Sequence, residues 1–233
     1  MRVLVTRPKI DADETARLLK ARGHIPLVAP LMEIRFRDGP EISLPGIQAI
    51  LATSSNGVAA LARRTSGRDV PLFAVGPRTA SVARDAGFQT VKMADGDALA
   101  LAGAARDWAQ PGNGALLHAA GAETKGELAM QLLRDGFDVR TIILYDAVAV
   151  TELPVACKSA LESDALDAVL MFSPRSSRIF SDCVVKAGLS EKCGRLIGCF
   201  ISQAAADSVS PLEFRAVRVA ESPNQDAMLR LLD

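Results

Sequence analysis

The stretch that decides the fold class reads Ile47-Gln48-Ala49-Ile50-Leu51-Ala52-Thr53-Ser54-Ser55-Asn56-Gly57-Val58. Its first six residues form a mostly apolar run of strand length, and the next four are polar residues typical of a turn or a helix start. Val58, Leu61 and Ala62 then share one face of a predicted helix. A strand that leads through a polar turn into a helix is the repeating unit of α/β folds with parallel sheets.

Similar strand, turn and helix patterns recur along the chain. Apolar runs of strand length occur at Val3–Val5, Ile25–Ala29, Leu72–Val75, Leu116–His118, Val139–Leu144 and Ala168–Phe172. The segment Ala49–Ser54 resembles Ala168–Ser173, and Val75–Ala80 lines up with Ile201–Ala206. Two similar α/β units in one chain predict two small domains with a ligand-binding cleft between them.

Two polar, proline-bearing breaks mark candidate domain boundaries. They are Arg35–Pro40 and Ala149–Pro154, and they flank the segment Ile42–Tyr145. Two such connectors allow sequential halves, or a central domain inserted into an outer one. The sequence pattern by itself does not choose between these two layouts.

Composition excludes several classes of function. The chain has 233 residues, 49% of them hydrophobic, and its 27 Lys and Arg balance its 27 Asp and Glu. This zero net charge argues against a general nucleic-acid binder. No apolar run approaches the roughly 20 residues that span a bilayer, and no signal peptide is recognised, so a cytoplasmic protein is predicted. The four cysteines and two histidines are too scattered to predict a metal site or a Ser-His-Asp triad.

Six small polar turns each follow a predicted strand and precede a predicted helix. They are Thr6-Arg7-Pro8, Thr53–Asn56, Gly76–Thr79, Ala120–Lys125, Ser173–Ser176 and Ser202-Gln203. A helix cap explains any one of them. Together, at the carboxyl ends of parallel strands, they would offer N–H donors to an anion. Arg7, Arg78, Lys125 and Arg175 would add positive charge, so we predict a phosphate or multi-carboxylate ligand.

Tyr145 is the only tyrosine of the chain and follows the apolar run Thr141–Leu144. One interpretation is an amphipathic packing residue with its hydroxyl in water. The other is a neutral proton donor facing the predicted cleft, because a phenol near its ordinary pKa stays protonated at neutral pH.

The chain resembles the uroporphyrinogen-III synthase family along essentially its whole length. The motifs that carry this resemblance, in order, are Val3–Pro8, Thr53–Val58, Ala74–Ala80, Leu144-Tyr145, Phe172–Pro174 and Val219–Pro223. The resemblance implies two flavodoxin-like three-layer domains with parallel sheets, joined by a two-stranded linker with the ligand cleft between the domains. One domain would comprise residues 1–34 and 152–233, the inserted one 40–143, and the linker strands 35–39 and 144–151.

The resemblance also implies the reaction. A linear hydroxymethylbilane loses its hydroxyl and closes through a spiro intermediate that inverts ring D, which yields uroporphyrinogen III for tetrapyrrole biosynthesis. Such a lyase would be a cytoplasmic monomer without cofactor or metal, and it would receive its substrate by transient handover from the preceding pathway enzyme. The alternative is a non-catalytic two-domain binder of an anionic small ligand or a tetrapyrrole.

The resemblance assigns residue roles as well. Tyr145 falls on the tyrosine proposed in the family to help the hydroxyl leave. The predicted substrate-binding residues are Thr6, Arg7, Ser54, Ser55, Asn56, Gly76, Arg78, Thr79, Gly121, Lys125, Ser173, Arg175, Ser202 and Gln203. This chain departs from the family pattern at Ala205, where many members have threonine, and at Ala120-Gly121, where many have an Arg-Gly pair.

Overall fold

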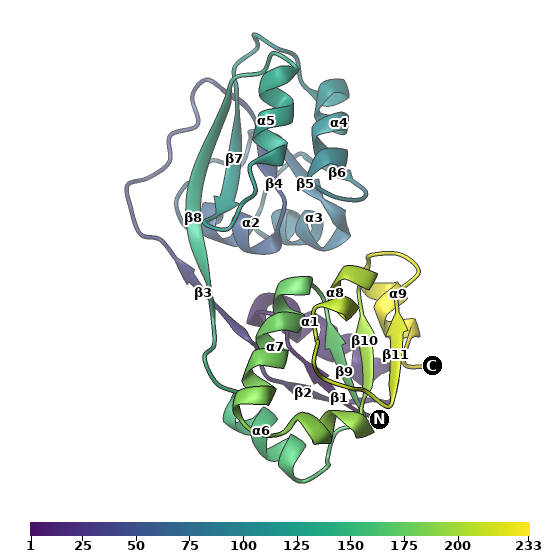
Figure 1. Ribbon diagram of the computed structural model, residues 1–233. Coiled ribbons are helices and arrows are strands. Elements are labelled where there is room, and N and C mark those ends of the chain that lie inside the picture. Colours follow the sequence, from purple (N-terminus) through teal and green to yellow (C-terminus); the bar gives the residue numbers. More distant parts are fainter. The chain divides into compact units, whose positions relative to one another are not determined.

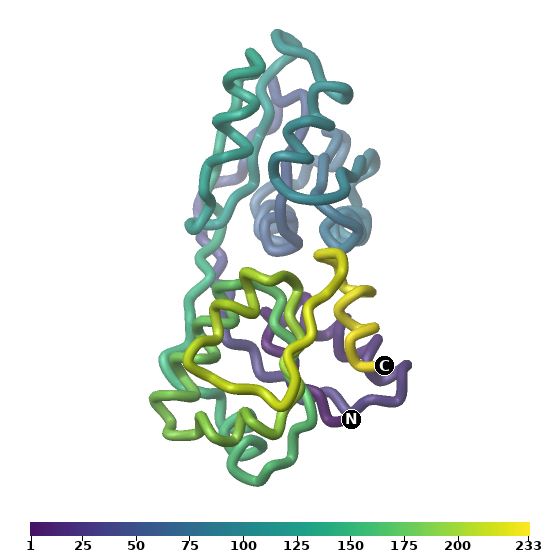
Figure 2. The backbone as a smooth tube through the Cα atoms, turned by 45° about the vertical axis from the view of Figure 1, so that its right-hand side comes forward, coloured from purple at the N-terminus to yellow at the C-terminus, as the bar shows by residue number.

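The computed structural model describes all 233 residues, which divide into two compact units. Unit 1 comprises Met1–Glu33 and Val148–Asp233, and unit 2 comprises Ile34–Ala147. Both chain termini therefore belong to unit 1, as the purple and yellow ends of the chain show in Figures 1 and 2. Unit 2 is one continuous stretch of sequence.

Unit 1 is built on a five-stranded sheet with the order β2-β1-β9-β10-β11. Its strands are β1 (Arg2–Val5), β2 (Ile25–Val28), β9 (Ala168–Met171), β10 (Ile197–Phe200) and β11 (Ala216–Val219), and every pairing is parallel. Its helices are α1 (Lys9–Ala21), α6 (Val155–Glu162), α7 (Pro174–Lys186), the 3-10 helix η1 (Ser190–Arg195), α8 (Gln203–Asp207) and α9 (Gln225–Arg230).

Unit 2 contains most of the second sheet, whose order is β3-β8-β7-β4-β5-β6. Its strands are β3 (Met32–Phe36), β4 (Ile47–Ala52), β5 (Leu72–Val75), β6 (Val91–Ala94), β7 (Ala115–Gly121) and β8 (Val139–Ala149), and its helices are α2 (Ser55–Ala62), α3 (Gly76–Asp85), α4 (Ala98–Trp108) and α5 (Glu127–Arg134). The chain passes between the units twice, in β3 and in β8, which are neighbours in the sheet.

Helices cover both faces of each sheet (Figure 1). In unit 1, Phe180 of α7 lies in the core on one face, and Leu19 of α1 and Met228 of α9 lie in the core on the other. In unit 2, Leu61 of α2 packs on one face and Leu101 of α4 on the other. The predicted fold class is confirmed: each unit is a three-layer α/β structure on a sheet whose strands are parallel, apart from the edge strand β3.

The two sheets have the same spatial order of strands, but the strand that comes first along the chain has a different place in each sheet. Unit 1 has β2-β1-β9-β10-β11, and unit 2 has β8-β7-β4-β5-β6 with β3 added at the edge. Strands β4, β5 and β6 thus occupy the places of β9, β10 and β11, and β7 and β8 occupy those of β1 and β2. This correspondence agrees with the internal repeat in the sequence and shows that the units are circular permutations of each other.

His118 in β7 is the buried titratable group with the clearest consequence for stability. Its side chain is 1% exposed, and neither ring nitrogen has a hydrogen-bond partner in the protein. Burial lowers the pKa of His118 from 6.5 to about 4, because the interior disfavours the charged imidazolium. Between these two pKa values the unfolded chain binds more protons than the folded chain, so protonation favours unfolding as the pH falls.

We therefore expect the His118→Leu variant to lose less stability in acid than the parent protein. The His118 contribution amounts to about 3 kcal/mol of lost stability at pH 4 relative to pH 7, from 1.36 kcal/mol per pKa unit. Urea unfolding of both proteins at pH 7 and pH 4 measures the free energy of unfolding. Carboxylates titrate in both proteins, so the variant shows how much of the loss in acid they cause. An equal loss in parent and variant would contradict this role of His118.

Candidate functional site

The topological switch point of unit 1 lies between β1 and β9. The connection after β1 leads to α1 on one face of the sheet, whereas the connection after β9 leads to α7 on the other face. In open α/β sheets, the crevice at the carboxyl ends of two such strands is the usual ligand site. Thr6 directly follows β1 and Ser173 lies just beyond β9, so both predicted residues lie at this point.

Thr6 and Ser173 each hold the backbone at the switch point of unit 1. The Thr6 side chain is fully buried, and its hydroxyl donates to the carbonyl oxygen of Leu170 at 2.9 Å, which ties the end of β1 to β9. Ser173 Oγ caps α7 by accepting the N–H of Ser176 at 3.0 Å. Helix α7 therefore begins at this edge of the sheet, where its first-turn N–H groups favour an anion.

Arg7 makes side-chain contacts that were not predicted from the sequence. Its guanidinium is 3.2 Å from the Asp11 carboxylate, donates to Gln225 Oε1 at 2.7 Å and lies 4.2 Å from the centre of the Phe172 ring. The spacing of Arg7 and Asp11, one helical turn apart, is a signal that could have been used. Gln225 lies near the other end of the chain, and no local pattern indicates that contact.

The remaining predicted residues of unit 1 lie in the first turns of α7 and α8. Arg175 is half-buried, and Ser202 caps α8 by accepting the N–H of Ala205 at 3.3 Å. Gln203 is exposed and donates to Asp207 at 2.8 Å. Ala205, which stands where many family members have threonine, is fully buried. At this position the side chain belongs to the core of unit 1.

Unit 2 has the equivalent switch point between β4 and β7. The connection after β4 leads to α2 on one face of the sheet, and the connection after β7 leads to α5 on the other. Ser54 lies just beyond β4, and Gly121 is the last residue of β7. Ser54 Oγ caps α2 by accepting the N–H of Gly57 at 3.1 Å. Two predicted residues from distant parts of the sequence therefore lie at the same edge of this sheet.

Tyr145 of β8 contacts both of these residues. Its hydroxyl oxygen is 2.9 Å from Ser54 Oγ, and its side chain is half-buried. A Cβ atom added to Gly121 would lie 2.6 Å from Cζ of the Tyr145 ring and 2.9 Å from its hydroxyl oxygen. The Tyr145 carbonyl also accepts the N–H of Ala122 at 2.9 Å. Gly121 thus leaves the space that the phenol ring occupies, and Ser54 contacts the phenol oxygen.

The first turn of α2 is packed closely against β7. Ser55 is 4% exposed and Asn56 is 8% exposed. A Cβ atom on Gly57 would lie 2.6 Å from the carbonyl oxygen of Ala119, so glycine permits this close approach. Because these side chains are buried, the position of the first turn of α2 in unit 2 is set by its packing against β7.

The predicted turn Gly76–Thr79 is instead the first turn of α3. Gly76 has a φ of 71°, which favours glycine, and Pro77 suits the start of a helix because its missing N–H would be unpaired there. Thr79 is buried and Arg78 is half-buried. Lys125 is exposed in the segment that leads from β7 to α5. The roles of all these residues as substrate ligands stay predictions.

The described chain contains no group of three or more His, Cys, Asp and Glu side chains that could hold a metal ion. No helix is long and apolar enough to cross a membrane. All four cysteines are free and buried, and burial raises the pKa of Cys157, Cys193 and Cys199 to about 12. None of these thiols is therefore an activated nucleophile.

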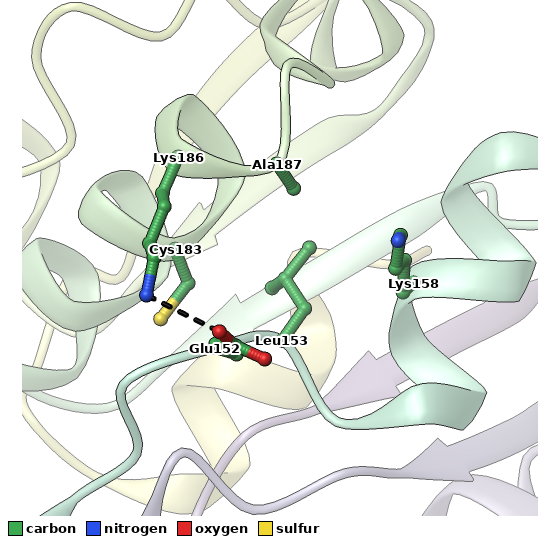
Figure 3. Close-up of a pocket in the computed structure, with 6 residues that line it drawn as sticks. All are labelled: Glu152, Leu153, Lys158, Cys183, Lys186 and Ala187. Carbon is green, nitrogen blue, oxygen red and sulfur yellow. Dashed lines mark hydrogen bonds and ion pairs between the residues drawn. The ribbon is translucent and has the colours of Figure 1, made fainter.

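A pocket of about 190 Å³ opens elsewhere in unit 1, between α7 and the segment that includes α6 (Figure 3). It is lined by Glu152, Leu153, Lys158, Cys183, Lys186 and Ala187. Lys186 is paired with Glu152 at 3.3 Å, the contact drawn as a dashed line. None of the predicted site residues lines this pocket, so it is separate from the switch point of unit 1.

Solved structures with a similar fold extend over the whole chain. The uroporphyrinogen-III synthetase of Helicobacter pylori 26695 is 16% identical with a TM-score of 0.65, and the match covers 100% of this chain and 98% of that one. A mutant uroporphyrinogen III synthase of the extremely thermophilic bacterium Thermus thermophilus is 18% identical with a TM-score of 0.54, covering 100% and 97%. At these identities the likeness concerns the fold.

Sequence comparison gives a more specific match. The family model described as uroporphyrinogen-III synthase HemD matches residues 13–230. A stretch of 61 residues is 39% identical to a Methanocaldococcus jannaschii protein described as "Putative uroporphyrinogen-III synthase". That second match covers 26% of this chain and 25% of the relative, so it spans about a quarter of the length of the curated relative.

Proposed function

Because the chain belongs to the uroporphyrinogen-III synthase family, we propose that it converts hydroxymethylbilane into uroporphyrinogen III, with inversion of ring D and loss of water. This reaction of tetrapyrrole biosynthesis is a cyclising elimination. The open-chain substrate also closes without an enzyme, to the isomer in which ring D is not inverted. The protein must therefore hold the substrate in a conformer whose reacting atoms are placed for the inverting closure. Such orientation lowers the activation free energy by several kcal/mol.

The single observation that carries the catalytic proposal is the contact of Tyr145 with Ser54 at the switch point of unit 2. The hydroxymethyl carbon–oxygen bond breaks with both electrons on the oxygen, Tyr145 gives that oxygen its phenolic proton, and water leaves. The neighbouring pyrrole nitrogen stabilises the resulting carbocation. After closure and rearrangement, a ring carbon loses the proton that returns the phenolate to phenol, so no other reactant is consumed.

The carboxylates of the substrate require hydrogen-bond donors and positive charge. We assign them to residues in the turns and helix starts that follow strands, Ser173 and Arg175 in unit 1 and Arg78 and Lys125 in unit 2. Because the net charge is zero, such local donors, and not the field of the whole protein, must attract the substrate. The buried predicted residues, such as Thr6 and Ser55, would act indirectly. They would hold the backbone N–H groups of these turns in position for the substrate.

Several further properties belong to the proposal. The family's division into a discontinuous domain, 1–34 with 152–233, and an inserted domain, 40–143, is the arrangement that would let two parts of the chain bind one substrate. The protein would act in the cytoplasm as a monomer. It would need no cofactor or metal, and it would take its unstable substrate by transient handover from the enzyme that makes it.

The product isomer tests this function. Purified protein is incubated with hydroxymethylbilane that is generated enzymatically in the same vessel, and the oxidised products are separated by chromatography. We expect isomer III, in an amount that rises with protein concentration, over the isomer I that forms spontaneously. Isomer I alone, at every protein concentration, would contradict the enzyme proposal and favour a non-catalytic binder. Protein inactivated by heat is the control.

A further inference from the structure

We propose that Ser54 is a positioning residue that donates its hydroxyl proton to the phenol oxygen of Tyr145 and thereby makes Tyr145 a stronger proton donor. This inference rests on the proposed function of Tyr145. Ser54 was predicted as a substrate ligand from the resemblance, and here its role is redirected to Tyr145. The two hydroxyl oxygens are 2.9 Å apart, which is the distance of a good hydrogen bond between hydroxyl groups.

The direction of this hydrogen bond follows from what Ser54 already does. A serine hydroxyl has one proton to donate and two lone pairs that accept. Ser54 Oγ accepts the N–H of Gly57, in the first turn of α2. Acceptance of an N–H at a helix start polarises the Ser54 O–H, which favours donation of that proton to the next acceptor. The phenol oxygen of Tyr145 is that acceptor.

The resulting chain of donors runs from Gly57 N–H to Ser54 O–H and then to the oxygen of Tyr145. Each member strengthens the next, and the last one stabilises negative charge on the phenol oxygen. When Tyr145 gives its proton to the departing hydroxyl, the O–H bond of the phenol breaks and its electron pair stays on the oxygen that Ser54 contacts. Ser54 thus acts on the developing phenolate without touching the substrate.

Three further contacts hold this chain of donors in place. The Tyr145 ring fills the space above Gly121, and its backbone carbonyl accepts the N–H of Ala122. Gly57 lies against the carbonyl of Ala119 in β7, which fixes the helix start on the same strand that ends at Gly121. Helix start, strand end and phenol are therefore positioned by one set of contacts within unit 2.

Several charged side chains lie on the segments next to Ser54 and Tyr145, and the variants that test the proposal leave all of them unchanged. Asp146 follows Tyr145 in β8 and is ion-paired with Arg37 at 2.7 Å. Glu123 and Lys125 lie in the segment that follows Gly121. Since none of these groups is substituted, their effect on the phenol is common to the parent protein and the variants.

The test uses Tyr145 as its own spectroscopic reporter, because it is the only tyrosine in the chain and the single Trp108 does not ionise. Absorbance of the tyrosinate is followed as the pH is raised for the parent, Ser54→Ala, Ser54→Thr and Asp97→Ala. Asp97 is the matched control, since it caps α4 in the same unit by accepting the N–H groups of Leu99 and Ala100 at 3.0 Å.

We expect the midpoint of the tyrosinate signal to move up by about one pH unit in Ser54→Ala, which is the scale of one lost hydrogen bond to a charged oxygen. It should stay near the parent value in Ser54→Thr and in Asp97→Ala. A downward or unchanged midpoint in folded Ser54→Ala would overturn the proposal, because it would mean that Ser54 does not donate to Tyr145. Circular dichroism at each pH verifies folding.

Turnover gives the second measurement. We expect Ser54→Ala to lower kcat by about 10- to 100-fold with little change in KM, and Ser54→Thr to restore most of the rate. Asp97→Ala should keep the parent kcat. A rise in KM at unchanged kcat would overturn the proposal in favour of a direct substrate contact. Failure of the proposed function would appear separately: the titration would shift in Ser54→Ala, while Tyr145→Phe would leave the rate unchanged.

Discussion

Replacement of Tyr145 by phenylalanine is expected to lower kcat by about 100- to 10,000-fold, the range that one general acid contributes. The variant loses the phenol oxygen that contacts Ser54 at 2.9 Å, and it keeps the ring that packs over Gly121. KM should change little, because the carboxylates of the substrate are assigned to other residues. Initial rates of isomer III formation, with hydroxymethylbilane supplied at several concentrations, measure both constants.

Stability separates a lost proton donor from a damaged fold. Removal of one half-buried hydrogen bond costs about 1 kcal/mol, so Tyr145→Phe should remain folded under assay conditions. Urea unfolding followed by the fluorescence of Trp108, which lies in α4 away from the switch point, checks this. A folded variant that makes isomer III at the parent rate would remove Tyr145 from the mechanism.

The second large effect is expected at Gly121. Its φ lies outside the left-handed region, so alanine meets no backbone strain there, but the new Cβ would lie 2.6 Å from the Tyr145 ring. The ring must move, and its hydroxyl then leaves Ser54. We expect Gly121→Ala to lower kcat by about 100-fold, because misplacement of a catalytic group by about 1 Å has a cost of that size.

A glycine in α4 provides the control for Gly121. A Cβ on Gly103 meets no atom nearer than 3.6 Å, so Gly103→Ala should leave both rate and fold intact. If Gly121 acts only through Tyr145, the double variant Gly121→Ala with Tyr145→Phe should be no slower than Tyr145→Phe alone. Independent, multiplying losses would contradict this explanation and point to a separate role for the end of β7.

Local sequence patterns were sufficient to predict the α/β class and several helix caps. The polar residues Ser54, Ser173 and Ser202 each follow an apolar strand, and each caps the next helix in the structure. Cap chemistry is decided by neighbours within one turn, which is why it can be predicted from sequence. The repeat also indicated the equivalence of the two sheets, since the same strands recur in the same relative places.

Contacts between distant segments were beyond local reasoning. The sequence predicted an apolar strand at Val139–Leu144, and the resemblance implied a linker strand at 144–151, whereas the structure has one continuous strand, β8, from Val139 to Ala149. The partner of Arg7, Gln225, comes from near the opposite end of the chain. The meeting of Ser54 with Tyr145 likewise depends on the placement of β8, β7 and β4 side by side in one sheet. Such contacts are set by tertiary packing, which leaves no periodic trace in sequence.

The insertion of unit 2 between the two segments of unit 1 has a consequence for folding during synthesis on the ribosome. Unit 2 is one continuous stretch, so all of its residues have been synthesised when residue 147 is added to the chain. In unit 1, β1 cannot pair with β9, its neighbour in the sheet, until the whole of unit 2 has been synthesised. Domains generally form as units during synthesis, and long-range pairings form slowly. The apolar strand Val3–Val5 therefore remains unpaired on one side during most of translation, the period in which a chaperone would protect it.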